Sequence, residues 1–110
     1  MSYNEAHGQD NRVIRIGKIR IDAAFLEEYK TAVKEHIETA VRVEPGVVTL
    51  YAVYDKKEPT NVTVFEIYAD QAAYESHIKT EHFKKYKTTT AHMVKFLELT
   101  DVSAIAMISK

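Results

Sequence analysis

The segment from Glu66 to Tyr86 reads EIYADQAAYESHIKTEHFKKY, and its change from strand pattern to helix pattern decides the fold. Its first residues alternate as in a β-strand, which places Glu66 and Tyr68 on the same side. Asp70 then offers an N-cap for a helix. That helix carries polar aromatic side chains among apolar positions that would face a core: Tyr74, His77, His82 and Tyr86. The segment therefore predicts a small, partly polar pocket between a sheet and a helix.

The rest of the chain alternates between strand and helix patterns. β-Branched residues and alternation predict strands at Arg12–Ile21 (with its basic residues facing solvent), Val47–Tyr54, Val62–Ala69 and about Val94–Ile108. Apolar residues at helical spacing predict one helix from Ala23 to about Val43 and another from Asp70 to about His92. We expect Pro45 to end the first helix and Thr80 to cap a fresh start within the second. The order β-α-β-β-α-β is the split βαβ arrangement of ferredoxin-like α+β folds.

A chain of 110 residues has the size of one domain. We expect residues 12–110 to form that domain and the polar, aperiodic residues 1–11 to be flexible. Two helices cover only one face of a four-stranded sheet, and Val47–Tyr54 is apolar on both of its sides. The bare face therefore needs a cover, and we predict a homodimer that packs sheet against sheet, with a mildly apolar monomer as the alternative.

Composition excludes several classes of protein. The 15 basic and 16 acidic residues are intermixed, so the chain lacks the basic patch of a protein that binds nucleic acid or anionic membranes. It has no apolar run of the roughly 20 residues that a membrane span needs, and no signal-type apolar segment at its N-terminus. The absence of cysteine excludes disulfides and thiolate chemistry, and it fits a cytoplasmic location.

Histidine and tyrosine side chains are the candidates for chemistry. Histidine exchanges protons near neutral pH, and a tyrosine hydroxyl can hold an oxyanion. His77 and His82 lie along the apolar stripe of the second helix, and His36 lies at the core boundary of the first. Two helices side by side on one sheet could bring these histidines towards Glu66 and Tyr68.

Each of these residues also has a purely structural interpretation. A histidine on an amphipathic helix is commonly a packed boundary residue, and Tyr29, Tyr51 and Tyr54 fit core or interface positions. Glu66 fits a cross-strand ion pair equally well.

Metal and dinucleotide sites are not predicted. His77 and His82 are five residues apart, which turns them by about 140° on an ideal helix, and the chain has neither cysteine nor an H-E-x-x-H motif. Three glycines without a G-x-G-x-x-G motif exclude a dinucleotide fold. Lys84, Lys85 and Lys87 form either a solvated helix face or an anion-attracting rim at the pocket mouth.

Three short motifs resemble those of the antibiotic biosynthesis monooxygenase (ABM) family. They are E-P-G at Glu44–Gly46, E-x-[W/Y] at Glu66–Tyr68 and H-x-x-T-x-H-[F/M/Y] at His77–Phe83, and the resemblance extends from about Val13 to Leu99. The resemblance implies a dimeric ferredoxin-like α/β barrel with one pocket per subunit. It also implies a monooxygenase that uses no metal, flavin or other cofactor and oxidises a small quinol or polycyclic phenol with molecular oxygen.

The residue pattern and the resemblance together give the expected site. We expect catalytic roles for His77, His82, Tyr74 and Tyr68, and substrate-binding roles for His36, Glu66, Tyr51, Phe83 and Tyr86. Tyr68 departs from the tryptophan common in the family, and Val64 stands where some polyketide-oxidising members carry asparagine. The motifs also resemble relatives that isomerise or degrade phosphorylated quorum-signal sugars. A third interpretation is a dimer that only binds a small molecule.

Overall fold

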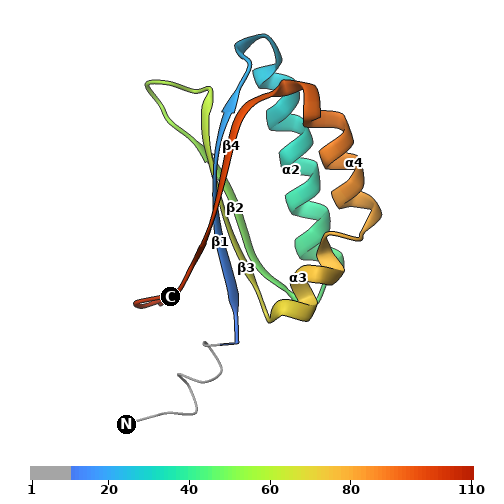
Figure 1. The fold of residues 1–110 in the computed structure, drawn as a ribbon, viewed down its shortest axis with the longest axis vertical. Coiled ribbons are helices and arrows are strands. Elements are labelled where there is room, and N and C mark those ends of the chain that lie inside the picture. The colour runs from blue at the N-terminus through green and yellow to red at the C-terminus, as the bar shows by residue number, and fades with distance from the viewer. Residues whose placement is uncertain (1–10) are drawn as a thin grey trace.

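The computed structural model describes residues 11–110, which form one four-stranded antiparallel sheet with helices on one of its faces (Figure 1). The elements in chain order are β1 (Val13–Ile21), the 3₁₀ turn η1 (Ala23–Phe25), α2 (Leu26–Val43), β2 (Val47–Tyr54), β3 (Asn61–Tyr68), α3 (Gln71–His77), α4 (Glu81–Thr90), the 3₁₀ turn η2 (Ala91–Met93) and β4 (Val94–Val102). The predicted ferredoxin-like α+β order is confirmed. The expectation of a flexible segment at residues 1–11 falls, except for Asn11, outside the described residues.

Short polar side chains begin the helices where the sequence predicts them. The Asp22 carboxylate accepts a hydrogen bond from the Ala24 amide at 3.0 Å, and the Asp70 carboxylate accepts one from the Ala73 amide at 2.8 Å. The Thr80 hydroxyl accepts one from the Phe83 amide at 3.2 Å, which starts α4 after the interruption that follows α3. Each cap satisfies an amide that would otherwise lack a partner in the first helical turn.

The last strand is shorter than predicted. It ends at Val102 rather than near Ile108, because β1 is its only partner among residues 11–110 and Val102 already pairs with Ile14 near the start of that strand. Beyond this point none of the described strands continues the backbone ladder, and apolar side chains such as Ile105 and Ile108 remain exposed.

The strand order β2-β3-β1-β4 determines which side chains face the helices. Within the sheet, Arg15 lies opposite Glu66, and Gly17 lies between Val64 on β3 and Leu99 on β4. Side chains alternate across each strand, so these residues share the face that the helices cover.

Two hydrophobic clusters fill the layer between sheet and helices. One is built around Ile19, Tyr29 and Val33, and the other around Ala40 and Leu50. The cavity described below borders both clusters.

The other face of the sheet carries large apolar side chains that remain exposed. Tyr51 is 64% exposed, Val53 60% and Phe96 51%. The described part of the chain contains no helix that is long and apolar enough to cross a membrane.

Candidate active site

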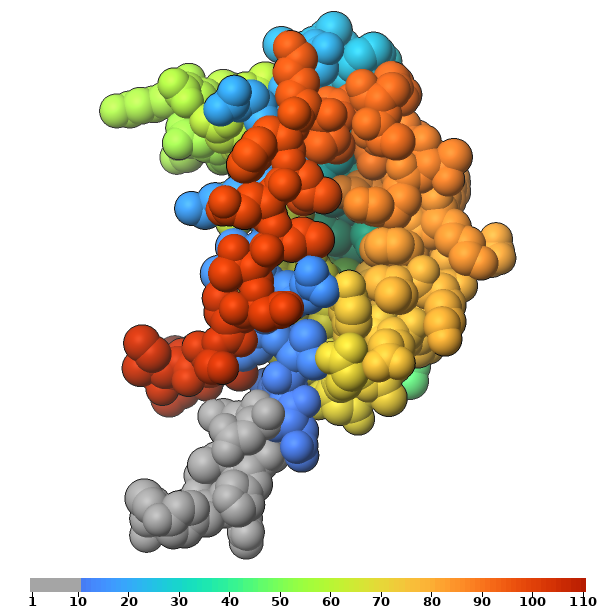
Figure 2. Space-filling view, in the orientation of Figure 1, coloured from blue at the N-terminus to red at the C-terminus, as the bar shows by residue number. Residues whose placement is uncertain are grey.

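A cavity of 310 Å³ lies between the inner face of the sheet and the helices. Figure 2 shows the molecule hollowed between β4 and the helices α3 and α4. Much of the wall is apolar, including Val33, Leu50, Val64, Leu97 and Leu99. The polar side chains that also line it are Arg15, His36, Glu66, Tyr68, Tyr74, His77, Tyr86, Lys87 and Thr90. Such an apolar pocket with a few convergent polar groups is the usual form of a small-molecule site.

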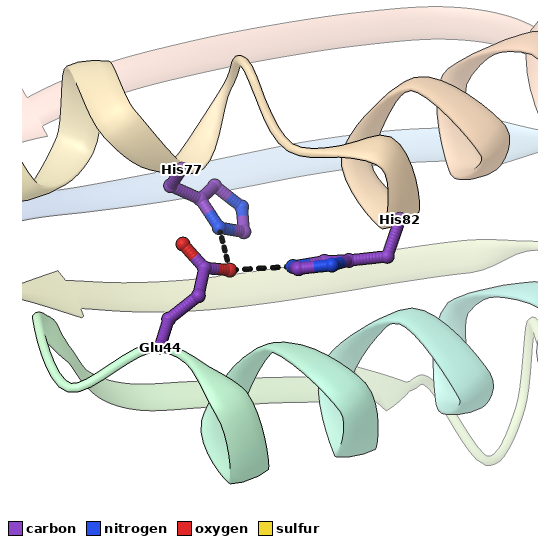
Figure 3. A group of neighbouring side chains, drawn as sticks. All are labelled: Glu44, His77 and His82. Atoms are coloured by element: carbon purple, nitrogen blue, oxygen red, sulfur yellow. Dashed lines mark hydrogen bonds and ion pairs between the residues drawn. The ribbon is translucent and has the colours of Figure 1, made fainter.

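The side chains of Glu44, His77 and His82, which we call the Glu44 cluster, meet at one wall of this cavity (Figure 3). Oε2 of Glu44 lies 2.8 Å from Nδ1 of His77 and 2.5 Å from Nε2 of His82. All three side chains are largely removed from solvent, with exposures of 12% for Glu44, 2% for His77 and 18% for His82.

The interruption between α3 and α4 is what brings the two histidines together. The ideal-helix argument, which turned them about 140° apart, is wrong for this chain because residues 78–80 leave the helix. His77 is the last residue of α3, whereas His82 lies in the first turn of α4, which is a separate helix (Figure 3).

A glycine lets the Glu44 loop approach α3 closely. A Cβ added to Gly46 would lie 2.5 Å from the Cβ of Ala73, so only glycine fits between this loop and the helix. The Gly46 carbonyl also accepts a hydrogen bond from the Ala69 amide at 2.8 Å. These contacts hold the end of α2, and with it Glu44, against the start of α3.

The shared carboxylate determines which ring nitrogen of each imidazole carries a hydrogen. Carboxylate oxygens accept hydrogen bonds, so Nδ1 of His77 and Nε2 of His82 each carry a hydrogen and donate a hydrogen bond to Glu44. In neutral His77 the lone pair is then on Nε2. His77 also lines the cavity, which makes it the cluster member suited to take a proton from a ligand.

The Glu44 cluster contains a donor set that metals use. Its three ligand atoms lie within 4.8 Å of one another, and two imidazoles with one carboxylate suit Zn²⁺ or Fe²⁺. However, neighbouring ligands of a tetrahedral ion with bonds of about 2.0 Å are about 3.3 Å apart. The contacts of 2.8 and 2.5 Å are therefore hydrogen bonds, and an ion would require the side chains to separate.

His36 reaches the same region from α2. It is 8% exposed, and its ring centroid lies 5.2 Å from that of His77 and 5.7 Å from that of His82. Burial, reinforced by the two neighbouring histidines, lowers the pKa of His36 from 6.5 to about 4, so it is neutral at pH 7. Its Nδ1 is buried without a hydrogen-bond partner among the described residues.

Tyr68 and Tyr74 differ in what their hydroxyl groups can do. The Tyr68 hydroxyl donates a hydrogen bond of 2.6 Å to Glu66. Burial, together with the adjacent Glu66 carboxylate, raises the pKa of Tyr68, so this residue stays protonated with its proton already engaged. The Tyr74 ring packs edge-on against Tyr68 at 5.2 Å, and the Arg15 guanidinium lies 4.8 Å from its centroid. Tyr74 is thus the better candidate to donate a hydrogen bond to an anion.

Tyr86 closes the cavity beside His36. The two rings stack with centroids 4.8 Å apart and an interplanar angle of 15°. The Tyr86 hydroxyl shares a hydrogen bond of 2.7 Å with the Tyr29 hydroxyl, and burial raises the pKa of Tyr86. Tyr86 therefore forms a rigid, neutral aromatic wall.

The structure brings most of the predicted site residues to one cavity. These are His36, Glu66, Tyr68, Tyr74, His77, Phe83 and Tyr86. His82 is placed differently, since it lines a small groove between α2 and α4 and reaches the cavity only through Glu44. Tyr51 lies on the outer face of the sheet, outside the cavity.

Sequence reasoning missed two residues of the site. Glu44 enters the sequence analysis only as part of the E-P-G motif, and no role in the site is predicted for it, although that motif was a usable signal. Arg15 was expected to face solvent with the other basic residues of its strand. It lines the cavity instead, because alternation puts it on the same face as Gly17 and Glu66.

The family model for antibiotic biosynthesis monooxygenase matches residues 12–89. The chain belongs to the ABM family. It is 51% identical to a "putative antibiotic biosynthesis monooxygenase" from Bacteriodes thetaiotaomicron, whose crystal structure superposes with a TM-score of 0.90 over 94% of this chain and 98% of that one. No curated protein matches the chain significantly.

More distant ABM-like structures share the fold. A "putative monooxygenase" from Lactobacillus acidophilus is 33% identical, with a TM-score of 0.82 over 86% of this chain and 45% of that longer one. A third, from Caulobacter crescentus, is 17% identical with a TM-score of 0.81 over 96% of this chain and 100% of that one, which is a likeness of fold alone.

Proposed function

We propose that this ABM-family protein is a cofactor-independent monooxygenase that oxidises a small quinol or polycyclic phenol with molecular oxygen. The observation that carries the proposal is His77, which lines a largely apolar cavity while its Nδ1 donates to a buried carboxylate. A carboxylate that orients a histidine and stabilises its protonated form is the arrangement of an effective general base.

The proposed reaction needs a base, an anion stabiliser and a dry cavity. Nε2 of His77 removes a phenolic proton, and the electron-rich phenolate passes electrons to oxygen as a C–O bond forms. The peroxide anion takes this proton back from His77 and becomes a hydroperoxide. His77 then removes the hydrogen that remains on the oxygenated carbon and passes it as a proton to the outer oxygen, so that the O–O bond breaks, a C=O bond forms and water leaves. Substrate and oxygen thus give a ketone or quinone and one water. Tyr74, beside the Arg15 cation, steadies the anion, and the apolar wall excludes water.

The sugar-phosphate alternative has weaker support. It needs several cations at the cavity, whereas only one of the three α4 lysines, Lys87, is among the lining residues, together with Arg15. Lys85 instead pairs with Glu35 at 2.7 Å on the surface. A largely apolar wall also suits a ring system better than a sugar phosphate.

The direct test is oxygen uptake with a panel of quinols and polycyclic phenols. We expect consumption of one oxygen per substrate, with activity retained after dialysis against a chelator, because no step uses a metal. The control is the same protein with added Zn²⁺ or Fe²⁺. Loss of activity on chelation and its return with one ion would show that the Glu44 cluster binds a metal and would overturn this mechanism.

We also propose that the protein is a homodimer joined through the outer face of its sheet. Tyr51, Val53 and Phe96 are each at least half exposed there, and β4 is exposed along almost its whole length. An apolar face of this kind is typical of an interface, and a stable one buries about 800 Å² per partner.

Sedimentation at micromolar concentration is expected to give twice the chain mass of 12.6 kDa. The double variant Tyr51→Lys, Phe96→Glu should shift the mass to that of a monomer, because each change places a charge in an apolar interface. A substitution on an exposed helix surface, Glu38→Lys, is the matched control. A monomeric wild-type protein would contradict the proposal.

A further inference from the structure

We infer that Gly17 determines which substrates fit, by leaving a flat floor on which a fused, planar ring system can lie. This inference rests on the proposed function and adds to it a residue that selects substrates by the size of their ring system. It concerns a residue with no side chain to react, so its role is one of shape.

Gly17 is unusual in its strand. It lies in the middle of β1 and is buried, where glycine weakens a strand and where a β-branched residue would be favoured. None of the described glycines has a positive φ, so the backbone at Gly17 does not require glycine. The reason for a glycine must therefore be the space beside it.

That space is cavity rather than packed protein. A Cβ built on Gly17 would have only two side-chain neighbours within 4 Å, namely Leu99 Cδ2 at 3.2 Å and Val64 Cβ at 3.9 Å. Both belong to the adjacent strands, and no atom of the helices comes within that distance. Gly17 itself lines the cavity.

Packing against Leu99 does not explain the glycine. The contact at 3.2 Å involves the far end of a flexible side chain, and Leu99 is 48% exposed, so it can move aside. A larger residue at position 17 would therefore be tolerated by the fold. A larger side chain at this position would instead reduce the volume of the cavity next to the sheet.

The chemistry around Gly17 indicates what uses that room. The backbone of Gly17, which carries no side chain, lines the cavity between Val64 and Leu99, and Tyr68 and His77 supply polar groups in the same cavity. A planar phenol would fit with its rings on the floor and its hydroxyl at the polar side chains. At 310 Å³ the cavity is at the small end of ligand sites, which start at about 300 Å³. Added methyl groups should thus exclude large ring systems first.

The experiment compares the variants Gly17→Ala and Gly17→Val with the wild type by calorimetric titration. The probes are phenol, with one ring, and 1-hydroxyanthraquinone, with three, and neither needs to be oxidised to bind. We expect Gly17→Val to lower the affinity for the three-ring probe at least tenfold and the affinity for phenol less than twofold. Gly17→Ala should lie between Gly17→Val and the wild type. The control is Lys18→Val, which adds a β-branched side chain one residue along, on the outer face.

Thermal unfolding accompanies each titration, and Gly17→Val should unfold at or above the wild-type temperature because it favours the strand. If Gly17→Val unfolds at a lower temperature than the wild type, the affinities of Gly17→Ala for the two probes decide the test instead. Equal weakening of both probes, or an unchanged three-ring affinity, would overturn the role of Gly17 while leaving the proposed function intact. A wild-type protein that binds neither probe would overturn both.

Discussion

Replacing His77 by asparagine is expected to lower kcat for quinol oxidation by about 10²–10⁴-fold, the usual contribution of a general base. Asn Nδ2 occupies nearly the place of histidine Nδ1, so it can still donate to Glu44, which lies 2.8 Å from Nδ1 in the wild type. Asparagine has no titratable lone pair in place of Nε2, and no proton acceptor remains at that point. The measurement is initial oxygen uptake at saturating substrate.

Two further variants separate chemistry from folding in this test. His77→Ala removes both the base and the hydrogen bond, so it should lose activity and also unfold at a lower temperature. His92→Ala removes an exposed histidine that packs on Phe25 away from the cavity, and it should match the wild type. Full activity in His77→Asn would mean that His77 is not the base. A wild-type protein that binds the probes but oxidises none of the phenols would favour a binding protein instead.

Replacing Glu44 by alanine is expected to produce the largest loss of stability of any single polar substitution in the site. It leaves the N–H groups of His77 and His82 without their acceptor in a largely buried position. Each buried group left unpaired costs about 1–3 kcal/mol, so with two such groups the free energy of unfolding should fall by about 2–6 kcal/mol. At about 4 °C per kcal/mol for a domain of this size, that corresponds to a decrease in Tm of about 8–24 °C.

The matched variants are Glu44→Gln and Glu35→Ala. Glutamine keeps an acceptor oxygen but lacks the negative charge that stabilises protonated His77, so it should keep most stability and lose most activity. Glu35 makes an exposed ion pair of 2.7 Å with Lys85, and such a pair is worth about 0–1 kcal/mol. A Glu44→Ala protein as stable as Glu35→Ala would show that the Glu44 cluster is not held by hydrogen bonds as described.

Local signals in the sequence were sufficient to locate where the helices begin. Asp22, Asp70 and Thr80 each act on amides within three residues, so their positions alone located the helix starts. The end of β4 could not be located in this way. Residues up to Ile108 have strand character, but a strand extends only as far as its partner, and β1 begins at Val13.

The pocket itself was also predictable, because polar aromatic side chains on an apolar helical stripe are costly to bury without a use. Alternation divided β2 into two sides, and yet it could not say which side the helices would cover. Tyr51 was therefore assigned to the pocket, although it lies on the outer face, and Arg15 was assigned to solvent, although it lies inside.

The sequence by itself determined the order of elements, the family and the set of histidines and tyrosines available for chemistry. Tertiary structure alone decided that Glu44 meets His77 and His82, which lie 33 and 38 residues further along the chain. It also decided that His77 faces the cavity while His82 supports it from behind. The physical reason is that caps and periodicity act within a few residues, whereas this contact depends on how two helices pack across one sheet and on the close approach that Gly46 permits.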